Sequence, residues 1–182
     1  MKTRNLVFVA LFSAMMAVLG FVPPIALSVT PVPITLQSLG VMLAGGLLGS
    51  RLGALSQIVF LLVVAAGAPL LSGGRGGFSV FIGPSAGYLL GYVVGAFVIG
   101  YCVERLREVS FLKLLIINII GGIFVVYCCG VFVQAFVMNI SIVKAAQLSV
   151  VFLPGDTLKA ILGAFLVTRL QRSLKRTIYR IN

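Results

Sequence analysis

The chain has 182 residues, of which 60% are hydrophobic and only 9% are charged, and its mean hydropathy is +1.20. A water-soluble globule could not cover its surface with this composition, so the chain is predicted to be a membrane protein. At about 20 residues for each spanning helix, this length allows roughly five to seven spans. We expect one transmembrane domain covering residues 1–182 and no soluble domain beside it.

Titratable side chains are few: 14 Lys and Arg, three Asp and Glu and no His, with a formal net charge of +11. Without histidine, Ser-His-Asp triads and imidazole metal sites are excluded, and three acids make a carboxylate dyad or a calcium cage hard to assemble. The absence of a GxxxxGK[ST] loop excludes ATP hydrolysis by that route, so uphill work would need a partner. We expect no enzyme activity, no cofactor and no metal.

The basic residues lie between apolar runs, where they orient helices, and not on the soluble surface that nucleic acid would require. The three cysteines, Cys102, Cys128 and Cys129, also fall in apolar stretches without metal-ligand spacing. An odd number with two adjacent members does not favour a disulfide framework. We interpret them as small core residues.

Six apolar segments succeed one another along the chain, near residues 6–21, 35–50, 53–68, 84–103, 113–136 and 150–169. The first begins like a secretory signal, but the chain beyond it is equally apolar, so it is interpreted as a span. With the amino terminus inside, every basic residue falls on the cytoplasmic side except Arg75, Lys144 and Lys159. The prediction is an all-α bundle of six transmembrane helices with both termini cytoplasmic.

Three segments assigned to the outer side are rich in proline or glycine or nearly uncharged: 22–34, 69–83 and 138–149, the last of which runs into Pro154-Gly155-Asp156. Free loops in water would be more polar, so we expect these segments to fold over the bundle and cap an outward-facing binding cavity. Short turns forced by proline and glycine are the alternative, chiefly for the first segment.

Small residues four apart mark surfaces where membrane helices approach closely. Gly87, Gly91 and Gly95 in the fourth predicted span, and Gly45, Gly49 and Gly53 across the second and third, are expected to be internal packing faces. Ala10 and Ala14 form another small-residue surface on the first predicted helix. Internal packing and docking of another membrane protein are equally compatible with that surface.

Asp156 and Lys159 are charges inside a predicted span, where an ionised side chain costs on the order of 3 kcal/mol. Their i, i+3 spacing puts both on one face of the last helix, so they can form an ion pair. A carboxylate that accepts N–H bonds beside an ammonium that donates to a carbonyl fits a urea-like group in a low-dielectric cavity. Helix N-capping by Asp156 is the alternative.

Arg75 is the one charge in an outer loop whose other members include Gly73, Gly74, Gly76 and Gly77. Successive glycines let backbone N–H groups converge on an anion. The fourth helix is expected to start at 83–85, with Pro84 in its first turn and the positive end of its dipole facing outward. An anionic ligand tail would be favoured there; a solvated loop charge is the alternative.

Further polar residues lie on or next to the spans. Gln37 and Tyr88 rank highest as ligand contacts because both are expected near Asp156 on the outer side. Helix-to-helix hydrogen bonding is the alternative for each of them. The lower-ranked members are Ser38, Asn118, Tyr127, Gln134 and Asn139.

Four separated segments resemble the signature of the BioY family, the substrate-binding S components of energy-coupling factor biotin transporters. They are Pro33-Ile34-Thr35-Leu36-Gln37-Ser38-Leu39-Gly40, residues 72–77, Gly83-Pro84-Ser85-Ala86-Gly87-Tyr88, and Phe152-Leu153-Pro154-Gly155-Asp156-Thr157-Leu158-Lys159-Ala160. The resemblance runs over essentially the whole chain. It implies a six-helix bundle in the cytoplasmic membrane of a bacterium that captures biotin on its outer face.

The resemblance also implies partners: a transmembrane coupling subunit with two ATPase subunits, although some members are proposed to act without them. The segment around Ala10 and Ala14 is similar to the small-residue motif with which S components dock to the coupling subunit. For biotin, the hypothesis is that Asp156 accepts ureido N–H groups, Lys159 donates to the ureido carbonyl, Tyr88 packs on the rings and the 73–77 loop holds the carboxylate. Leu89 is apolar and offers no polar contact.

Two other functions remain open from the sequence. An S component specific for another vitamin would share the architecture, and a stand-alone secondary carrier could use Asp156 as its proton site. A purely structural membrane subunit is disfavoured by the cost of burying Asp156 and Lys159.

Overall fold

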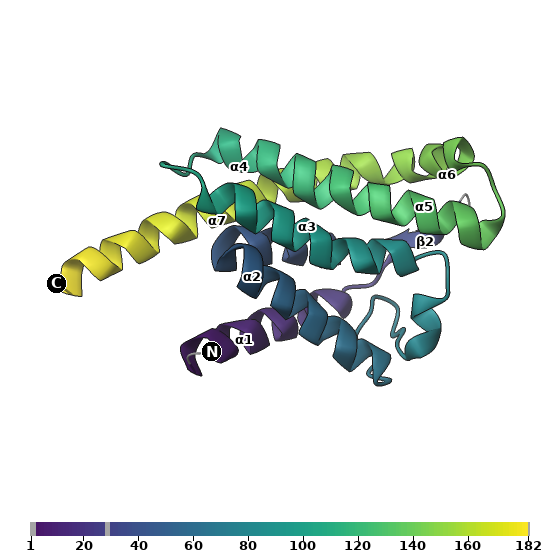
Figure 1. Ribbon diagram of the computed structural model, residues 1–182, viewed down its shortest axis with the longest axis horizontal. Coiled ribbons are helices and arrows are strands. Elements are labelled where there is room, and N and C mark those ends of the chain that lie inside the picture. Colours follow the sequence, from purple (N-terminus) through teal and green to yellow (C-terminus); the bar gives the residue numbers. More distant parts are fainter. Residues whose placement is uncertain (1–2, 28–29, 182) are drawn as a thin grey trace.

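The computed structural model describes residues 3–27 and 30–181, and it describes side chains up to Gln171 except that of Leu27. This part of the chain is helical apart from one small hairpin (Figure 1). The α-helices are α1 (Thr3–Gly20), α2 (Gln37–Ala65), α3 (Ala86–Glu104), α4 (Phe111–Asn118), α5 (Val126–Met138), α6 (Ile142–Ser149) and α7 (Leu153–Ile181). Strands β1 (Ile25–Leu27) and β2 (Thr30–Ile34) form the hairpin, and the remaining turns are η1 (Phe78–Phe81), the π-helical η2 (Ile119–Val125) and η3 (Val150–Phe152).

Within the described residues, five helical stretches are long and apolar enough to cross a membrane, one fewer than the predicted six. The difference lies in α2, which takes the place of the predicted spans 35–50 and 53–68. It consists of two helical arms joined at Gly49, whose φ of 82° and ψ of −175° are not helical. A Cβ on Gly53 would lie 3.0 Å from the Ala44 carbonyl oxygen, so the arms fold back on each other. Hydropathy correctly predicted both arms. It placed a short linker between them, whereas in the structure a single residue, Gly49, reverses the chain.

Glycines make the contacts between α3 and its neighbours very close. A Cβ on Gly91 would lie 3.0 Å from Val126 Cα, and one on Gly95 would lie 2.7 Å from the Gly121 carbonyl oxygen. A Cβ on Gly45 would meet the Ala96 carbonyl oxygen at 2.6 Å. The expected packing faces are therefore confirmed for these positions, and they join α3 to α2, η2 and α5.

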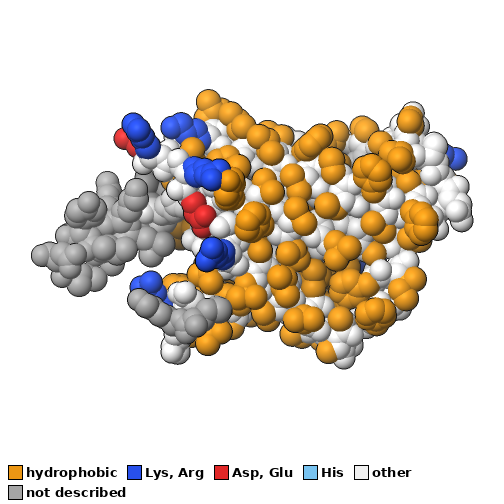
Figure 2. All heavy atoms as spheres, in the orientation of Figure 1, with side chains coloured by type: hydrophobic (Ala, Val, Ile, Leu, Met, Phe, Trp, Pro, Cys, Tyr) orange, Lys and Arg blue, Asp and Glu red, His pale blue; other side chains and the backbone are white. Residues whose placement is uncertain are grey.

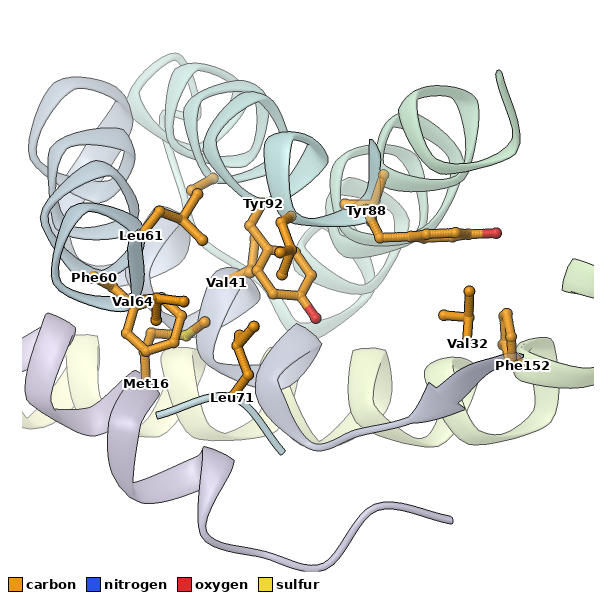
Figure 3. Close-up of a cluster of buried hydrophobic side chains, with 13 residues drawn as sticks. Met16, Val32, Val41, Phe60, Leu61, Val64, Leu71, Tyr88, Tyr92 and Phe152 are labelled. Carbon is orange, nitrogen blue, oxygen red and sulfur yellow. The ribbon is translucent and has the colours of Figure 1, made fainter. Parts of the chain in front are cut away.

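Two of the segments predicted to lie on the outer side fold onto the bundle. Val32 of β2 is 7% exposed and Leu71, in the connection after α2, is 2% exposed. Both belong to a core cluster with Met16, Phe60 and Val64, side chains from α1 and the second arm of α2 (Figure 3). The alternative of plain turns for residues 22–34 is wrong, because part of that segment forms the β1–β2 hairpin.

Several element boundaries also differ from the sequence-based ones. Helix α3 begins at Ala86, so Pro84 lies in the turn before the helix and not in its first turn. The predicted span 113–136 contains seven π-helical residues in η2, and most of the predicted outer segment 138–149 is helix α6. Cys128 is exposed, so the prediction of a core position is wrong for it, whereas half-buried Cys102 packs against a core cluster with Ile99 and Val103.

The surface separates charge from apolar side chains. Hydrophobic side chains cover the broad middle of the face seen in Figure 2, and most of its Lys and Arg side chains gather at one end. The start of α1 and the end of α7 lie at this same end (Figure 1). The exposed basic side chains include Arg4 on α1, Arg51 after the reversal of α2, Arg105 and Arg107 in the α3–α4 connection, Lys113 on α4 and Arg169 on α7. Such a pattern is typical of a bundle inserted in a bilayer.

Candidate functional site

A narrow cavity of about 60 Å³ lies among β2, the start of α2, the 71–75 connection, the start of α3, η2, α5, η3 and the start of α7. Every α-helix except α1, α4 and α6 contributes to its wall. The polar and charged side chains that line it are Thr35, Gln37, Ser38, Arg75, Ser85, Tyr88, Tyr92, Tyr127, Asp156 and Lys159. The cavity therefore combines both charges predicted within the last span with polar groups from distant segments of the chain.

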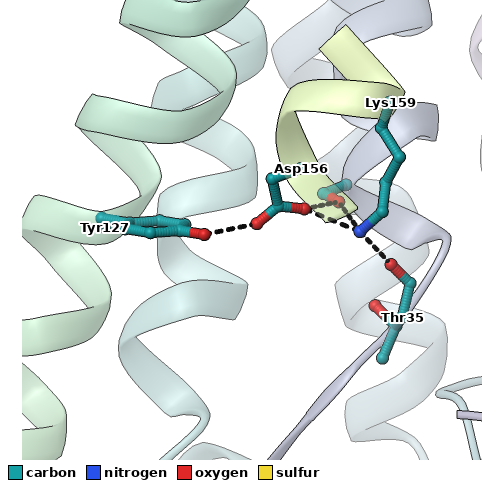
Figure 4. A network of polar contacts seen from close by, with 5 residues as sticks. Thr35, Tyr127, Asp156 and Lys159 are labelled. Atoms are coloured by element: carbon teal, nitrogen blue, oxygen red, sulfur yellow. Dashed lines mark hydrogen bonds and ion pairs between the residues drawn. The ribbon is translucent and has the colours of Figure 1, made fainter. Parts of the chain in front are cut away.

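Asp156 and Lys159 form a buried ion pair, as their spacing predicted. Lys159 Nζ lies 2.6 Å from Asp156 Oδ1, and each residue is 6% exposed (Figure 4). The first two turns of α7 hold both on the face that turns toward β2, α2 and α5. Removing two charges from water is costly, and the pair persists because further polar groups surround it.

The neighbours of the pair come from distant parts of the chain. Ser38 Oγ donates to Asp156 Oδ1 at 3.0 Å and accepts from Lys159 Nζ at 3.0 Å. Lys159 Nζ also donates to the Thr35 carbonyl oxygen at 2.6 Å, and Tyr127 Oη donates to Asp156 Oδ2 at 2.6 Å. In the described part of the chain, the Asp156 carboxylate accepts from side chains and not from a backbone N–H. The N-cap alternative for Asp156 is therefore wrong.

Donors and acceptors at the pair can be counted. An ammonium has three N–H donors, and those of Lys159 are directed at Asp156, Ser38 and Thr35. A carboxylate can accept about four hydrogen bonds, and Asp156 accepts three. A ligand carbonyl can thus bond to Lys159 only by displacing one of its present partners.

Aromatic side chains form one wall of the cavity. The Tyr88 ring makes edge contacts with Tyr127 and Phe152, with both centroid distances at 6.2 Å, and Tyr127 and Phe152 meet at 6.4 Å. The Tyr88 hydroxyl is hydrogen-bonded to Gln134 Oε1 at 2.9 Å and to Ser149 Oγ at 2.7 Å. Because its hydroxyl is held by α5 and α6, Tyr88 offers the cavity an apolar ring edge.

Gln37 lines the cavity, as predicted, but its amide nitrogen is engaged by the scaffold. Gln37 Nε2 donates to the carbonyl oxygens of Met16 at 3.3 Å and Leu70 at 3.2 Å. These bonds tie the start of α2 to α1 and to the outer connection. Gln37 therefore has a structural role whatever else it contacts.

The glycine-rich loop contributes less to the cavity than the sequence suggested. Of its residues 73–77, only Arg75 lines the cavity, and it is half-buried with Nε donating to the Ser72 carbonyl oxygen at 3.2 Å. The backbone N–H groups of Arg75 and Gly77 donate to the Leu71 and Val64 carbonyl oxygens. The loop therefore does not present a continuous row of free backbone N–H groups to an anion. The residue of the loop that lines the cavity is Arg75. Gly73, Gly74 and Gly76 line two open clefts beside Arg75.

Sequence reasoning ranked Ser38 and Tyr127 too low. Both bond directly to the ion pair, whereas the higher-ranked Gln37 and Tyr88 bond to other parts of the scaffold. No spacing of small residues marks Ser38, because Gly40 and Ala44 lie two and six residues further on and therefore on a different face of the same arm. Nothing local marks Tyr127, because the π-helical turns of η2 decide its direction.

The other lower-ranked polar residues have structural roles. Asn118 Nδ2 donates to the Ala160 carbonyl oxygen at 3.2 Å and ties α4 to α7. Gln134 accepts from Tyr88, and Asn139 adopts the left-handed conformation, φ 50°, that ends α5. None of these three lines the cavity.

The small-residue surface of α1 is split between two roles. Ser13 Oγ donates to the Val9 and Ser56 carbonyl oxygens, at 2.9 and 2.7 Å, so this edge faces α2. Ala10 and Ala14 are exposed. Internal packing therefore accounts for Ser13 but not for the two alanines.

A buried ion pair lining a cavity under a folded cover, in a bundle with an apolar exterior, defines a multi-pass membrane protein with a site for a small polar molecule. Comparison with known proteins identifies which one. The BioY family matches over residues 1–176, and the chain belongs to this family.

The relatives match along nearly their whole length. The probable biotin transporter BioY of Bacillus subtilis is 51% identical over 174 residues, covering 96% of this chain and 94% of the relative. The biotin transporter BioY of Rhizobium etli is 48% identical, covering 91% and 92% of the two chains. A crystal structure of the S-component for biotin from an ECF-type ABC transporter superposes with a TM-score of 0.90 at 37% identity, covering 94% of this chain and 92% of that one. These relatives are named as transport proteins, and the chain is a multi-pass protein of the cell membrane.

Proposed function

We propose that the protein binds biotin and carries it across the cytoplasmic membrane as the S component of an energy-coupling factor transporter. The single observation that carries the proposal is the Asp156–Lys159 pair lining a cavity in a chain of the BioY family. Biotin has a ureido ring with two N–H donors and one carbonyl, an apolar thioether ring and a carboxylate tail. The cavity has a partner for each part.

The ureido group is proposed to bind at the ion pair, with Asp156 accepting N–H and Lys159 donating to the carbonyl. The hydroxyl of Ser38 already makes this pattern of bonds, since it donates to Asp156 Oδ1 and accepts from Lys159 Nζ. A ureido N–H and carbonyl can therefore replace the Ser38 hydroxyl without leaving either charge unpaired. Unpaired buried charges are the costly outcome that this exchange avoids.

The cavity walls provide contacts for the rest of biotin. The thioether ring packs against the aromatic edges of Tyr88 and Phe152, and the carboxylate pairs with the Arg75 guanidinium, assisted by the 73–77 loop. Gln37 holds the scaffold beneath. The cavity of about 60 Å³ is narrow, so the outer connection that carries Arg75 has to move outward as biotin enters.

In the membrane, the two arms of α2 are proposed to act as separate spans, which gives six passes with both termini in the cytoplasm. The gathering of exposed basic side chains at one end supports this orientation. The cavity then opens to the outside, below the hairpin and the 71–83 segment. Exposed Ala10 and Ala14 are proposed to dock the transmembrane coupling subunit, which works with two ATPase subunits.

Calorimetric titration of the detergent-purified chain tests the proposal. Biotin is expected to bind, and other vitamins to fail to compete with it. Asp156→Asn and Lys159→Ala should each weaken biotin binding by about 100-fold or more, because each leaves one buried charge without its partner. Lys113→Ala, at an exposed position on α4, is the matched control and should leave affinity unchanged. Unchanged affinity in both site variants would rule out the head-group contacts.

Biotin methyl ester tests the tail. Wild-type protein should prefer the acid over the ester, and Arg75→Gln should remove most of that preference while leaving ester affinity nearly unchanged. Equal affinity of wild-type protein for ester and acid would reject Arg75 as the carboxylate partner.

A further inference from the structure

A second cavity, apolar and open to the membrane side, lies between α5 and the segment formed by α6, η3 and the start of α7. Its volume is about 290 Å³. Figure 1 shows α5 and α6 side by side at the end away from the chain termini. We call it the lateral groove. Its walls include Phe124 and Val131 from one side and Ala146, Val150 and Leu153 from the other.

The lateral groove offers nothing to bond a polar molecule. Its polar side chains are Tyr127 and Ser149, and both hydroxyls already have partners: Tyr127 bonds Asp156, and Ser149 bonds Tyr88 and the Ala145 carbonyl oxygen. Water needs two to four polar partners to occupy a cavity, so water does not stabilise this groove. An unfilled groove of this volume would forfeit dispersion contacts along its whole lining.

The position of the groove identifies what can fill it. The exposed hydrophobic surface of the protein continues directly into it, because Phe132 is 63% exposed and Val150 56% exposed at its edges. This surface faces the bilayer, so the hydrocarbon chains of lipids reach the groove.

One layer of side chains separates the lateral groove from the ion-pair cavity. Tyr127 lines both, with its hydroxyl on Asp156. Ser149 lines the groove and holds the hydroxyl of Tyr88, which lines the cavity. Whatever occupies the groove therefore contacts Tyr127 directly and reaches Tyr88 only through Ser149.

We propose that the lateral groove is a binding site for one acyl chain of a membrane phospholipid, and that this chain braces Tyr127 against Asp156. The acyl-chain site is inferred from the groove alone. Its effect on biotin rests on the proposed function.

Photocrosslinking tests the site without biotin. The full chain is placed in phosphatidylcholine nanodiscs containing phosphatidylglycerol with a diazirine in one chain, and adducts are mapped by mass spectrometry. Adducts should concentrate on residues 124–132 and 142–153, several-fold above those at other exposed apolar residues such as Leu62 and Phe165. An even distribution of adducts over the exposed apolar surface would overturn the proposal.

Variants that fill the groove sharpen the test. Ala146→Phe should remove the excess adducts, whereas Val143→Phe, on the same helix but outside the groove, should keep them. Cys128→Phe fills the groove from α5 and should act like Ala146→Phe, which guards against misfolding of one variant. Retention of the excess in both filled variants would also overturn the proposal.

Biotin titration tests the bracing. Wild-type affinity should fall several-fold when lipid is stripped with detergent and return when lipid is added back, while Ala146→Phe, with a ring in place of the chain, should not change. Equal wild-type affinity with and without lipid would contradict the bracing. If wild-type protein bound no biotin under either condition, the proposed function would fail, and the crosslinking result would still decide the lipid site.

Discussion

Asp156 and Glu104 are both carboxylates held by hydrogen bonds, and their surroundings differ. Glu104, at the end of α3, is exposed, and its two oxygens accept from the backbone N–H of Ser50 at 2.8 Å and from Ser50 Oγ at 2.9 Å. It therefore caps the start of the second arm of α2, directly after the reversal at Gly49. Asp156 is buried and is held by side chains from three elements beside a cavity.

These surroundings keep Glu104 bound to its present partners, whereas Asp156 can exchange its partners for a ligand. A backbone N–H at the start of a helix needs an acceptor in every state of the protein, so Glu104 cannot change partners without loosening the helix. Side-chain hydroxyls can rotate away at little cost. The acid available to a ligand is thus the more buried of the two, which exposure alone would not indicate.

The largest effect is expected on stability when one partner of the ion pair is removed. Lys159→Ala leaves Asp156 buried without its cation, which costs about 3–5 kcal/mol and should lower the melting temperature by roughly 10 °C. The double variant Asp156→Asn/Lys159→Met keeps the volume and removes both charges, so it should regain most of the loss. Thermal melting in detergent, followed by circular dichroism, measures both. A double variant no more stable than Lys159→Ala would show that charge burial does not dominate here.

The next effect concerns the hydroxyl of Tyr127. Tyr127→Phe removes one donor to the Asp156 carboxylate and keeps the ring, so biotin affinity should fall about 10-fold. Tyr101→Phe, at an exposed position near the far end of α3, is the matched control. Calorimetric titration of both variants measures the difference, and equal affinities for the two would remove Tyr127 from the site.

A smaller effect is expected at Glu104. Glu104→Ala removes the cap of the second arm and should lower the melting temperature by about 2–4 °C, with biotin affinity unchanged. Glu108→Ala, in the α3–α4 connection, should change neither quantity. A loss of biotin affinity in Glu104→Ala without loss of stability would contradict the division between the two acids.

The smallest effect tests the exchange at Ser38. Because the ureido group is proposed to displace the Ser38 hydroxyl, Ser38→Ala should strengthen biotin binding by about 2- to 5-fold, since the two hydrogen bonds of that hydroxyl to the ion pair no longer compete. Ser85→Ala, also at the cavity wall, is the control. Weaker binding in Ser38→Ala would show that the hydroxyl stays and positions the pair.

Local sequence was enough to predict the features that depend on hydropathy and spacing. The apolar segments, the packing glycines of α3 and the i, i+3 ion pair each depend on residues close together in the chain. The reversal at Gly49 could not be predicted in this way, because it is supported by a distant partner: Glu104, which caps Ser50 from 54 residues further along the chain. We expected a loop between the two arms, but Gly49 and the Glu104 carboxylate are enough to reverse the chain.

The two charged residues of the candidate site could be predicted from the sequence, but the residues that hydrogen-bond to them could not. Asp156 and Lys159 stand out because charges are rare in an apolar span. Ser38 lies 118 residues before Asp156 and Thr35 lies 124 residues before Lys159, and the sequence contains no sign that they meet the pair. Tyr127 is directed by the π-helical η2, and no residue pattern in the sequence indicates π-helical turns there.

The most direct test of the central claim measures whether the biotin ureido group reaches Lys159. Biotin labelled with ¹³C at the ureido carbonyl is bound to protein labelled with ¹⁵N at the lysine side chains, and rotational-echo double-resonance NMR measures their dipolar coupling. A hydrogen bond from Nζ to the carbonyl oxygen places the two labels within about 4 Å, so strong dephasing is expected, and Lys159→Arg should abolish it. Bound biotin that shows no dephasing in wild-type protein would contradict the account.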